Sequence, residues 1–105
     1  MGDRVSISFK NEQEESVALF YHWGGVEFPK VALAYAKEYA KANDGHGYNI
    51  STPTTRLEPS TIMVRFIHDI KYNDSIYLGK DENDGDNSDN GHYIIDLKSL
   101  KLVRK

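Results

Sequence analysis

The chain has 105 residues, of which 39% are apolar, which predicts a single domain over residues 1–105 built around one core. It contains no cysteine, which excludes disulfides, thiolate nucleophiles and cysteine-based zinc sites and favours a cytoplasmic protein. No stretch has membrane-spanning length and no broad basic face accompanies the net charge of −3, so neither a membrane nor duplex nucleic acid is an expected partner.

Two strands are expected to open the fold. Alternation of apolar and polar residues predicts a strand over residues 5–10, with Val5, Ile7 and Phe9 turned inward. After a polar connector, residues 16–22 show the same alternation. We therefore expect the two strands to pair as a hairpin.

Two helices are expected next. Pro29 occupies a favoured first-turn position, and the helix over residues 29–43 carries one apolar stripe, made of Ala32, Tyr35, Ala36, Tyr39 and Ala40. Residues 44–57 form a long connector rich in Gly, Ser, Thr and Pro, and loops of this length are often functional. Pro59 then begins a second helix, with an apolar face made of Ile62, Phe66, Ile67 and Ile70.

The last third of the chain predicts more strands. Residues 76–78 and 92–97 are expected to form two strands joined by an acidic hairpin loop, and residues 100–103 a short final strand. The order of elements predicts an α+β fold: an antiparallel sheet of four or five strands with two helices on one face.

A binding site is expected where the second strand ends in His22-Trp23-Gly24-Gly25, because glycine lets backbone approach a ligand closely. Its second wall is expected in the connector, where hydroxyls and a guanidinium suit phosphate or carboxylate; the residues concerned are His46, Tyr48, Ser51, Thr52 and Arg56. The connector lacks the Gly-Lys-Ser/Thr ending of a P-loop. The alternative is an ordinary bend with Trp23 in the core, followed by a connector that caps the second helix.

The same two patches carry a resemblance. A strand ending in His-Trp-Gly-Gly, a helix, and then Gly-Tyr-Asn-Ile-Ser-Thr at residues 47–52 resemble a group of short proteins from phage, bacterial and archaeal genomes. This chain departs from the group at Asn49, where the pattern has Gly. No activity is established for that group, so the resemblance implies a fold, a site and a role in countering host defence, but no reaction.

A second candidate surface is the acidic loop, whose acids are Asp81, Glu82, Asp84, Asp86 and Asp89. They predict either a solvated, mobile tip or a docking surface for a basic partner protein. Asp86, Ser88 and Asn90 also match the opening of a calcium loop. Leu97 stands where such a loop needs its bidentate Glu, so we expect calcium to change nothing.

Catalytic motifs are missing from the sequence. The leading hypothesis is therefore a binding protein for a small anionic, nucleotide-like ligand, without a cofactor. The alternatives are a module that docks a basic partner and, third, a metal-dependent hydrolase using His22, His46 and His92. Burial gained on pairing favours a homodimer through a sheet edge or the first helix, where Tyr35 and Tyr39 lie.

Overall fold

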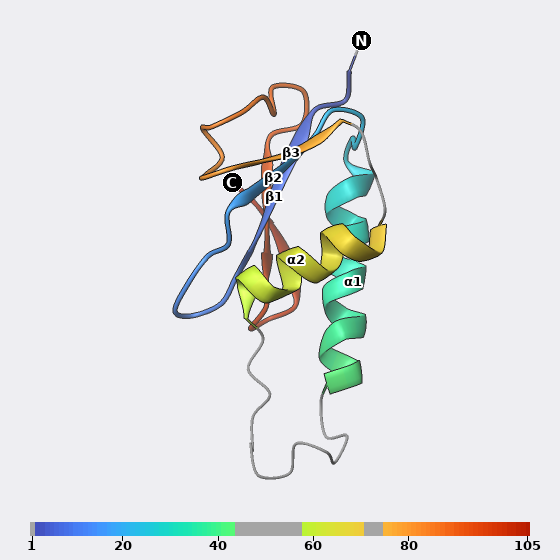
Figure 1. Ribbon diagram of the computed structural model, residues 1–105, viewed down its shortest axis with the longest axis vertical. Helices are drawn as coiled ribbons and strands as arrows, with labels where there is room; N and C mark the ends of the chain where they lie inside the picture. Colours follow the sequence, from blue (N-terminus) through green and yellow to red (C-terminus); the bar gives the residue numbers. More distant parts are fainter. Residues whose placement is uncertain (1, 44–57, 71–74) are drawn as a thin grey trace.

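The computed structural model describes residues 2–43, 58–70 and 75–105. The five strands that it describes form one sheet in the order β3-β2-β1-β4-β5. Two helices pack on one face of this sheet, and the acidic segment lies on the other side (Figure 1). The predicted α+β fold is confirmed. Its elements are β1 (Val5–Lys10), β2 (Ala18–Tyr21), α1 (Glu27–Asn43), α2 (Pro59–Ile70), β3 (Ile76–Gly79), β4 (His92–Asp96) and β5 (Lys101–Arg104).

The sheet is mixed rather than wholly antiparallel. β1 and β2 form the predicted hairpin, and β3 and β5 pair antiparallel with β2 and β4. β4, however, runs parallel to β1, with Ser6 beside His92 in the register. β3 and β4 therefore point the same way on opposite sides of the β1–β2 pair. Parallel strands need a crossover connection, so the predicted acidic hairpin is wrong: residues 80–91, here called the crossover segment, traverse the sheet.

Successive side chains of a strand point to opposite faces of the sheet, so every second side chain lies against the helices. Val5, Ile7 and Phe9 of β1 are fully buried there, as predicted. The two helices supply the other half of the core from the expected stripes and from Phe28 and Met63, which the stripes did not include, with Pro29 and Pro59 in their first turns. The helical residues that are fully or nearly fully buried are Phe28, Ala32, Ala36, Ile62, Met63 and Phe66.

Tyr35 and Tyr39 pack against this core instead of forming an exposed patch on α1. The Tyr35 hydroxyl donates a 2.6 Å hydrogen bond to Asp69 of α2, which lowers the pKa of the carboxyl. Tyr35 thus joins the two helices. Dimerisation through a sheet edge or α1 stays a prediction. In the described ranges, neither helix is long and apolar enough to cross a membrane.

The crossover segment covers the sheet face that is turned away from the helices. Phe20 of β2 points to this side, is fully buried, and stacks on Tyr77 of β3 with ring centroids 5.0 Å apart. Gly85 sits so close that an added Cβ would lie 2.8 Å from Tyr77 and 2.9 Å from Phe20. The acidic segment is therefore packed onto the sheet and does not extend into solvent as a tip.

Candidate functional site

The bend after β2 is held by backbone hydrogen bonds to its neighbours. The Asp3 amide donates to the His22 carbonyl over 2.9 Å, and the His22 amide donates to Ser75 over 3.0 Å. Trp23 is 55% exposed, and the edge of its ring meets His22 at a centroid distance of 4.3 Å. Trp23 is thus outside the core, contrary to the alternative of an ordinary bend with Trp23 buried, and part of its aromatic surface is exposed.

The two glycines of the bend have structural causes. A Cβ at Gly24 would lie 2.7 Å from Val5 and from the Phe28 Cβ, so the close packing of β1 and α1 excludes any side chain. Gly25 has a φ of +58°, in the left-handed region that glycine adopts without cost. Its amide donates to the Asp3 carbonyl over 2.8 Å. The motif therefore turns the chain tightly into α1, whether or not a ligand binds there.

The expected second wall of that site, formed by His46, Tyr48, Ser51, Thr52 and Arg56, lies outside the described residues. Helix α1 separates the bend from the point where that connector begins. At ~1.5 Å per residue, its 17 residues span about 25 Å. The described residues therefore do not bring the two patches together.

The described charges around the bend do not favour an anion. Arg4, beside the bend, forms ion pairs with Asp86 at 3.1 Å and Asp89 at 3.2 Å. The pKa of Asp86 is lowered, chiefly by its hydrogen bonds with Ser88 and further by the charge of Arg4. Arg4 is thus already neutralised by acids of the crossover segment.

All five predicted partner-binding acids lie in the crossover segment, and each has an internal contact. Asp81 and Asp84 accept backbone N–H bonds within the segment, from Asn83 and Lys80, each over 2.9 Å. Glu82 pairs with Lys105 at 2.7 Å. Asp86, the first expected calcium ligand, uses one oxygen on the Ser88 amide and the other on Arg4. Glu82, Asp86 and Asp89 therefore fasten the segment to the rest of the fold, and Asp81 and Asp84 fix its local backbone.

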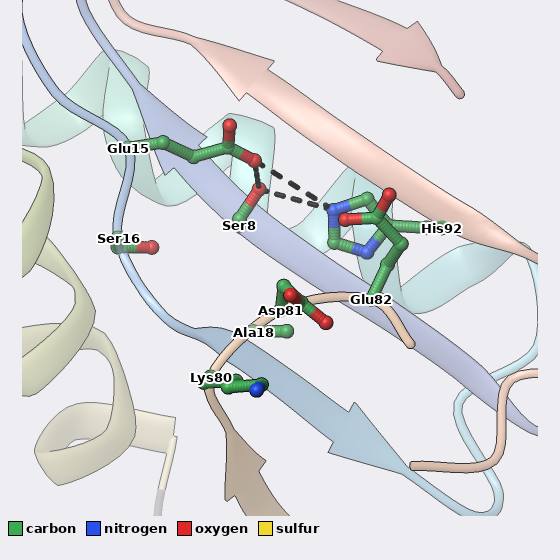
Figure 2. A pocket seen from close by; sticks show the side chains of 8 residues that line it. All are labelled: Ser8, Glu15, Ser16, Ala18, Lys80, Asp81, Glu82 and His92. Carbon is green, nitrogen blue, oxygen red and sulfur yellow. Dashed lines mark hydrogen bonds and ion pairs between the residues drawn. The ribbon is translucent and has the colours of Figure 1, made fainter. Parts of the chain in front are cut away.

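A small polar cavity opens where the crossover segment meets the sheet, with a volume of about 130 Å³. Its floor comes from outward-facing residues of β1, β2 and β4, and its walls come from the β1–β2 connector and the crossover segment. Figure 2 shows Glu15 beside Ser8 and His92, with Asp81 and Glu82 on the segment across from them. The lining residues are Ser8, Glu15, Ser16, Ala18, Lys80, Asp81, Glu82 and His92.

The hydrogen bonds at the cavity floor run in one direction. Ser8 Oγ donates to Glu15 Oε2 over 2.7 Å. A hydroxyl has a single proton, so the 3.1 Å contact between Ser8 Oγ and His92 Nε2 has the imidazole N–H as its donor. His92 Nδ1 then accepts from Ser6 Oγ over 2.7 Å, and Ser6 Oγ accepts from Asn87 Nδ2 over 2.8 Å. Each group thus donates to the next, from the crossover segment to Glu15.

The direction of these hydrogen bonds requires one protonated and one unprotonated ring nitrogen, which is the neutral form of His92. His92 is only 4% exposed, and burial lowers its pKa despite the nearby carboxylates of Glu82 and Glu15. The set contains serine, histidine and carboxylate, but His92 donates to Ser8 instead of accepting its proton. A general base must accept that proton, so His92 is not placed as a general base for Ser8, whose proton is held by the Glu15 carboxylate. The cavity floor is polar, with fixed donors and acceptors.

The described residues do not form the metal site that the hydrolase hypothesis requires. Both ring nitrogens of His92 bond to serine hydroxyls, and His46 lies outside the described residues. Within the part of the chain that the structure describes, no group of three His, Cys, Asp or Glu side chains is placed to hold a metal ion.

The residues that line the cavity form no recognisable sequence motif. The only sequence signal was the alternation in β1, which predicts that Ser6 and Ser8 face away from the core. His92 joins them through the parallel pairing of β4 with β1, and Asp81 and Glu82 through the crossover. Both juxtapositions depend on strand order. Comparison of the chain with protein-family models, curated proteins and solved structures gives no match.

Proposed function

We propose that this chain is a non-catalytic binding protein that docks a basic partner, and that its cavity receives one cationic side chain of that partner. The observation that carries the proposal is the convergence of three carboxylates, Glu15, Asp81 and Glu82, on one small cavity. They come from two segments far apart in the sequence. Because the charge of Glu82 is already balanced by Lys105, Glu15 and Asp81 supply the attraction, with Lys80 opposing it.

Size and chemistry favour a guanidinium. Pockets that take whole small-molecule ligands have volumes of about 300–1,000 Å³, so the cavity, at about 130 Å³, suits one side-chain head group rather than a nucleotide. A guanidinium presents five N–H donors in a plane and pairs well with carboxylates. The side chain of Glu15 is 34% exposed, so its second oxygen is within reach of an incoming donor.

The test is titration with a short Arg-Gly repeat peptide, followed by calorimetry and by NMR shifts of the cavity residues. Glu15→Gln is expected to weaken binding roughly tenfold, since a hydrogen bond to a charged group contributes ~1.5–3 kcal/mol. Gln keeps an acceptor for the Ser8 hydroxyl, so the floor stays intact. A point variant is preferable to a deletion because the crossover segment covers Phe20.

Glu14→Gln is the matched control, because Glu14 is exposed and adjacent but does not line the cavity. It removes the same charge and is expected to leave the affinity almost unchanged. Equal losses for the two variants would mean that only overall charge attracts the peptide. A Glu-Gly repeat peptide should not bind, and raising the salt concentration should weaken the Arg-Gly complex.

A second candidate, the nucleotide-like ligand, is favoured by the exposure of Trp23. A partly exposed indole with His22 beside it suits stacking on a base, which contributes ~1–3 kcal/mol per base. Trp23→Ala is therefore expected to weaken binding of a nucleoside monophosphate at least about fivefold. Trp23 is the only tryptophan in the chain, so its fluorescence reports occupancy directly. Unchanged fluorescence with all four nucleoside monophosphates would remove this candidate.

A further inference from the structure

The chain of hydrogen bonds at His92 links the sheet to the crossover segment. Asn87 is the first donor in this series of hydrogen bonds. Its side-chain amide donates to two acceptors: Ser6 Oγ at 2.8 Å and the Glu82 carbonyl at 3.1 Å. The second contact holds the backbone at Glu82, in the cavity wall. Asn87 therefore acts as a latch that ties the wall of the cavity to β1.

The latch depends on the protonation state of His92. Ser6 donates its only proton to His92 Nδ1 and accepts from Asn87. A proton taken from water by Nδ1 turns that atom into a donor, so Ser6 Oγ then faces donors on both sides and its own proton loses its acceptor. Ser6 regains an acceptor if Asn87 turns its carboxamide over. That turn removes the hydrogen bond to the Glu82 carbonyl.

We propose that protonation of His92 releases the Asn87 latch and loosens residues 80–85, so that the cavity is intact near neutral pH and opens in mild acid. The mechanism is a reversal of hydrogen-bond direction at Ser6, inside a buried network. The latch is a property of this chain alone and does not depend on the proposed partner.

The charged groups that face His92 come from three segments. Glu15 belongs to the β1–β2 connector, Asp81, Glu82 and the wall residue Lys80 to the crossover segment, and Lys105 to the end of the chain. The carboxylates favour a protonated imidazole, whereas burial, the strongest influence, and Lys105 oppose it. Because the pKa of His92 is lowered in the folded state, the unfolded chain takes up the proton first. Stability is therefore expected to fall as the pH drops below about 6.5.

The other anchors of the crossover segment persist in this pH range. The pKa of Glu82 is lowered, chiefly by its contact with Lys105, and that of Asp86 is also lowered. Both carboxylates therefore stay ionised while His92 titrates. Arg4 keeps its ion pairs with Asp86 and Asp89, so residues 86–91 remain attached. Loosening is thus confined to the half of the segment that forms the cavity wall.

The test is an NMR titration of the free protein between about pH 8 and 5. At neutral pH, the His92 ring should be in the neutral form with its proton on Nε2. As it titrates, the Asn87 side-chain amide signals should shift with the same midpoint. The backbone amides of Asn83 and Asp84 should lose protection against hydrogen exchange roughly fivefold, relative to β1 amides, as the loss of one hydrogen bond predicts.

Ser6→Ala is the decisive variant, because it removes the hydroxyl that transmits the change and leaves His92 in place. In Ser6→Ala, His92 should still titrate while Asn87 no longer follows it. His68→Gln is the control, because His68 is exposed on α2 and takes no part in the network. Asn87 signals that stay constant while His92 titrates would overturn the proposal, and so would a His92 that stays neutral down to about pH 5. Failure of peptide binding alone would count only against the proposed partner.

Discussion

Phe66→Ala is expected to lower the free energy of unfolding by about 3–5 kcal/mol, the range for removing a large buried aromatic side chain. Phe66 is fully buried on α2. Its ring contacts Phe9 of β1, Phe28 and Tyr35 of α1, with centroid distances of 5.9, 5.7 and 5.3 Å. One side chain thus joins α2 to the sheet and to α1.

Domains of this size are stable by only about 5–15 kcal/mol, so the variant should unfold at a markedly lower urea concentration. Circular dichroism during urea denaturation measures the change. Val64→Ala is the matched control, because Val64 lies on the same helix and is 67% exposed. It is expected to change stability by less than about 0.5 kcal/mol. Similar losses for both variants would contradict the packing described for α2.

Gly24→Ala is expected to cost about 1–3 kcal/mol, the range for forcing extra volume into a packed site. The added methyl group would lie 2.7 Å from the Val5 side chain and the Phe28 Cβ, and 2.9 Å from the Tyr21 ring. The Phe28 Cβ is attached directly to the α1 backbone, so it cannot move aside without shifting the helix. Urea denaturation of the purified variant provides the measurement.

The matched control is Gly25→Asn at the next position. Asn adopts the left-handed backbone more readily than other residues, and the nearest atoms to a Cβ at Gly25 are 3.7 Å away, on Asp3. Asn at a φ of +58° still carries some backbone strain, but without a steric clash the variant should cost less stability than Gly24→Ala. A Gly24→Ala protein of normal stability that had lost nucleotide binding would show instead that Gly24 serves ligand approach.

Local patterns were good guides to the elements. The period-two alternation in β1 and the apolar stripes of both helices predicted which faces are buried, although not the buried Phe28 and Met63, because burial on one face produces that spacing wherever the element lies. Pro59 marked the start of α2 correctly, since proline suits a first helical turn. The same patterns placed Ser6 and Ser8 on the outer face without indicating what lies above them.

Candidate sites were predicted less well, for a physical reason. A binding site was predicted at His22-Trp23-Gly24-Gly25 because four unusual residues are adjacent there. The structure explains the two glycines by packing and backbone conformation. The cavity at Ser8 and His92 has no such local signature. Its residues are ordinary in type, and they are separated by most of the length of the chain.

The sequence by itself determined the α+β class, the elements, the inward faces and the charge of residues 81–90, because these follow from local spacing and composition. Only the tertiary structure decided that β4 runs parallel to β1 and that the acidic residues cross the sheet. The short apolar runs of β3 and β4 are equally compatible with a hairpin and with separate pairing on either side of β1 and β2. The choice between them depends on which edges are open for hydrogen bonding, and that choice brings His92, Ser6 and Asn87 together.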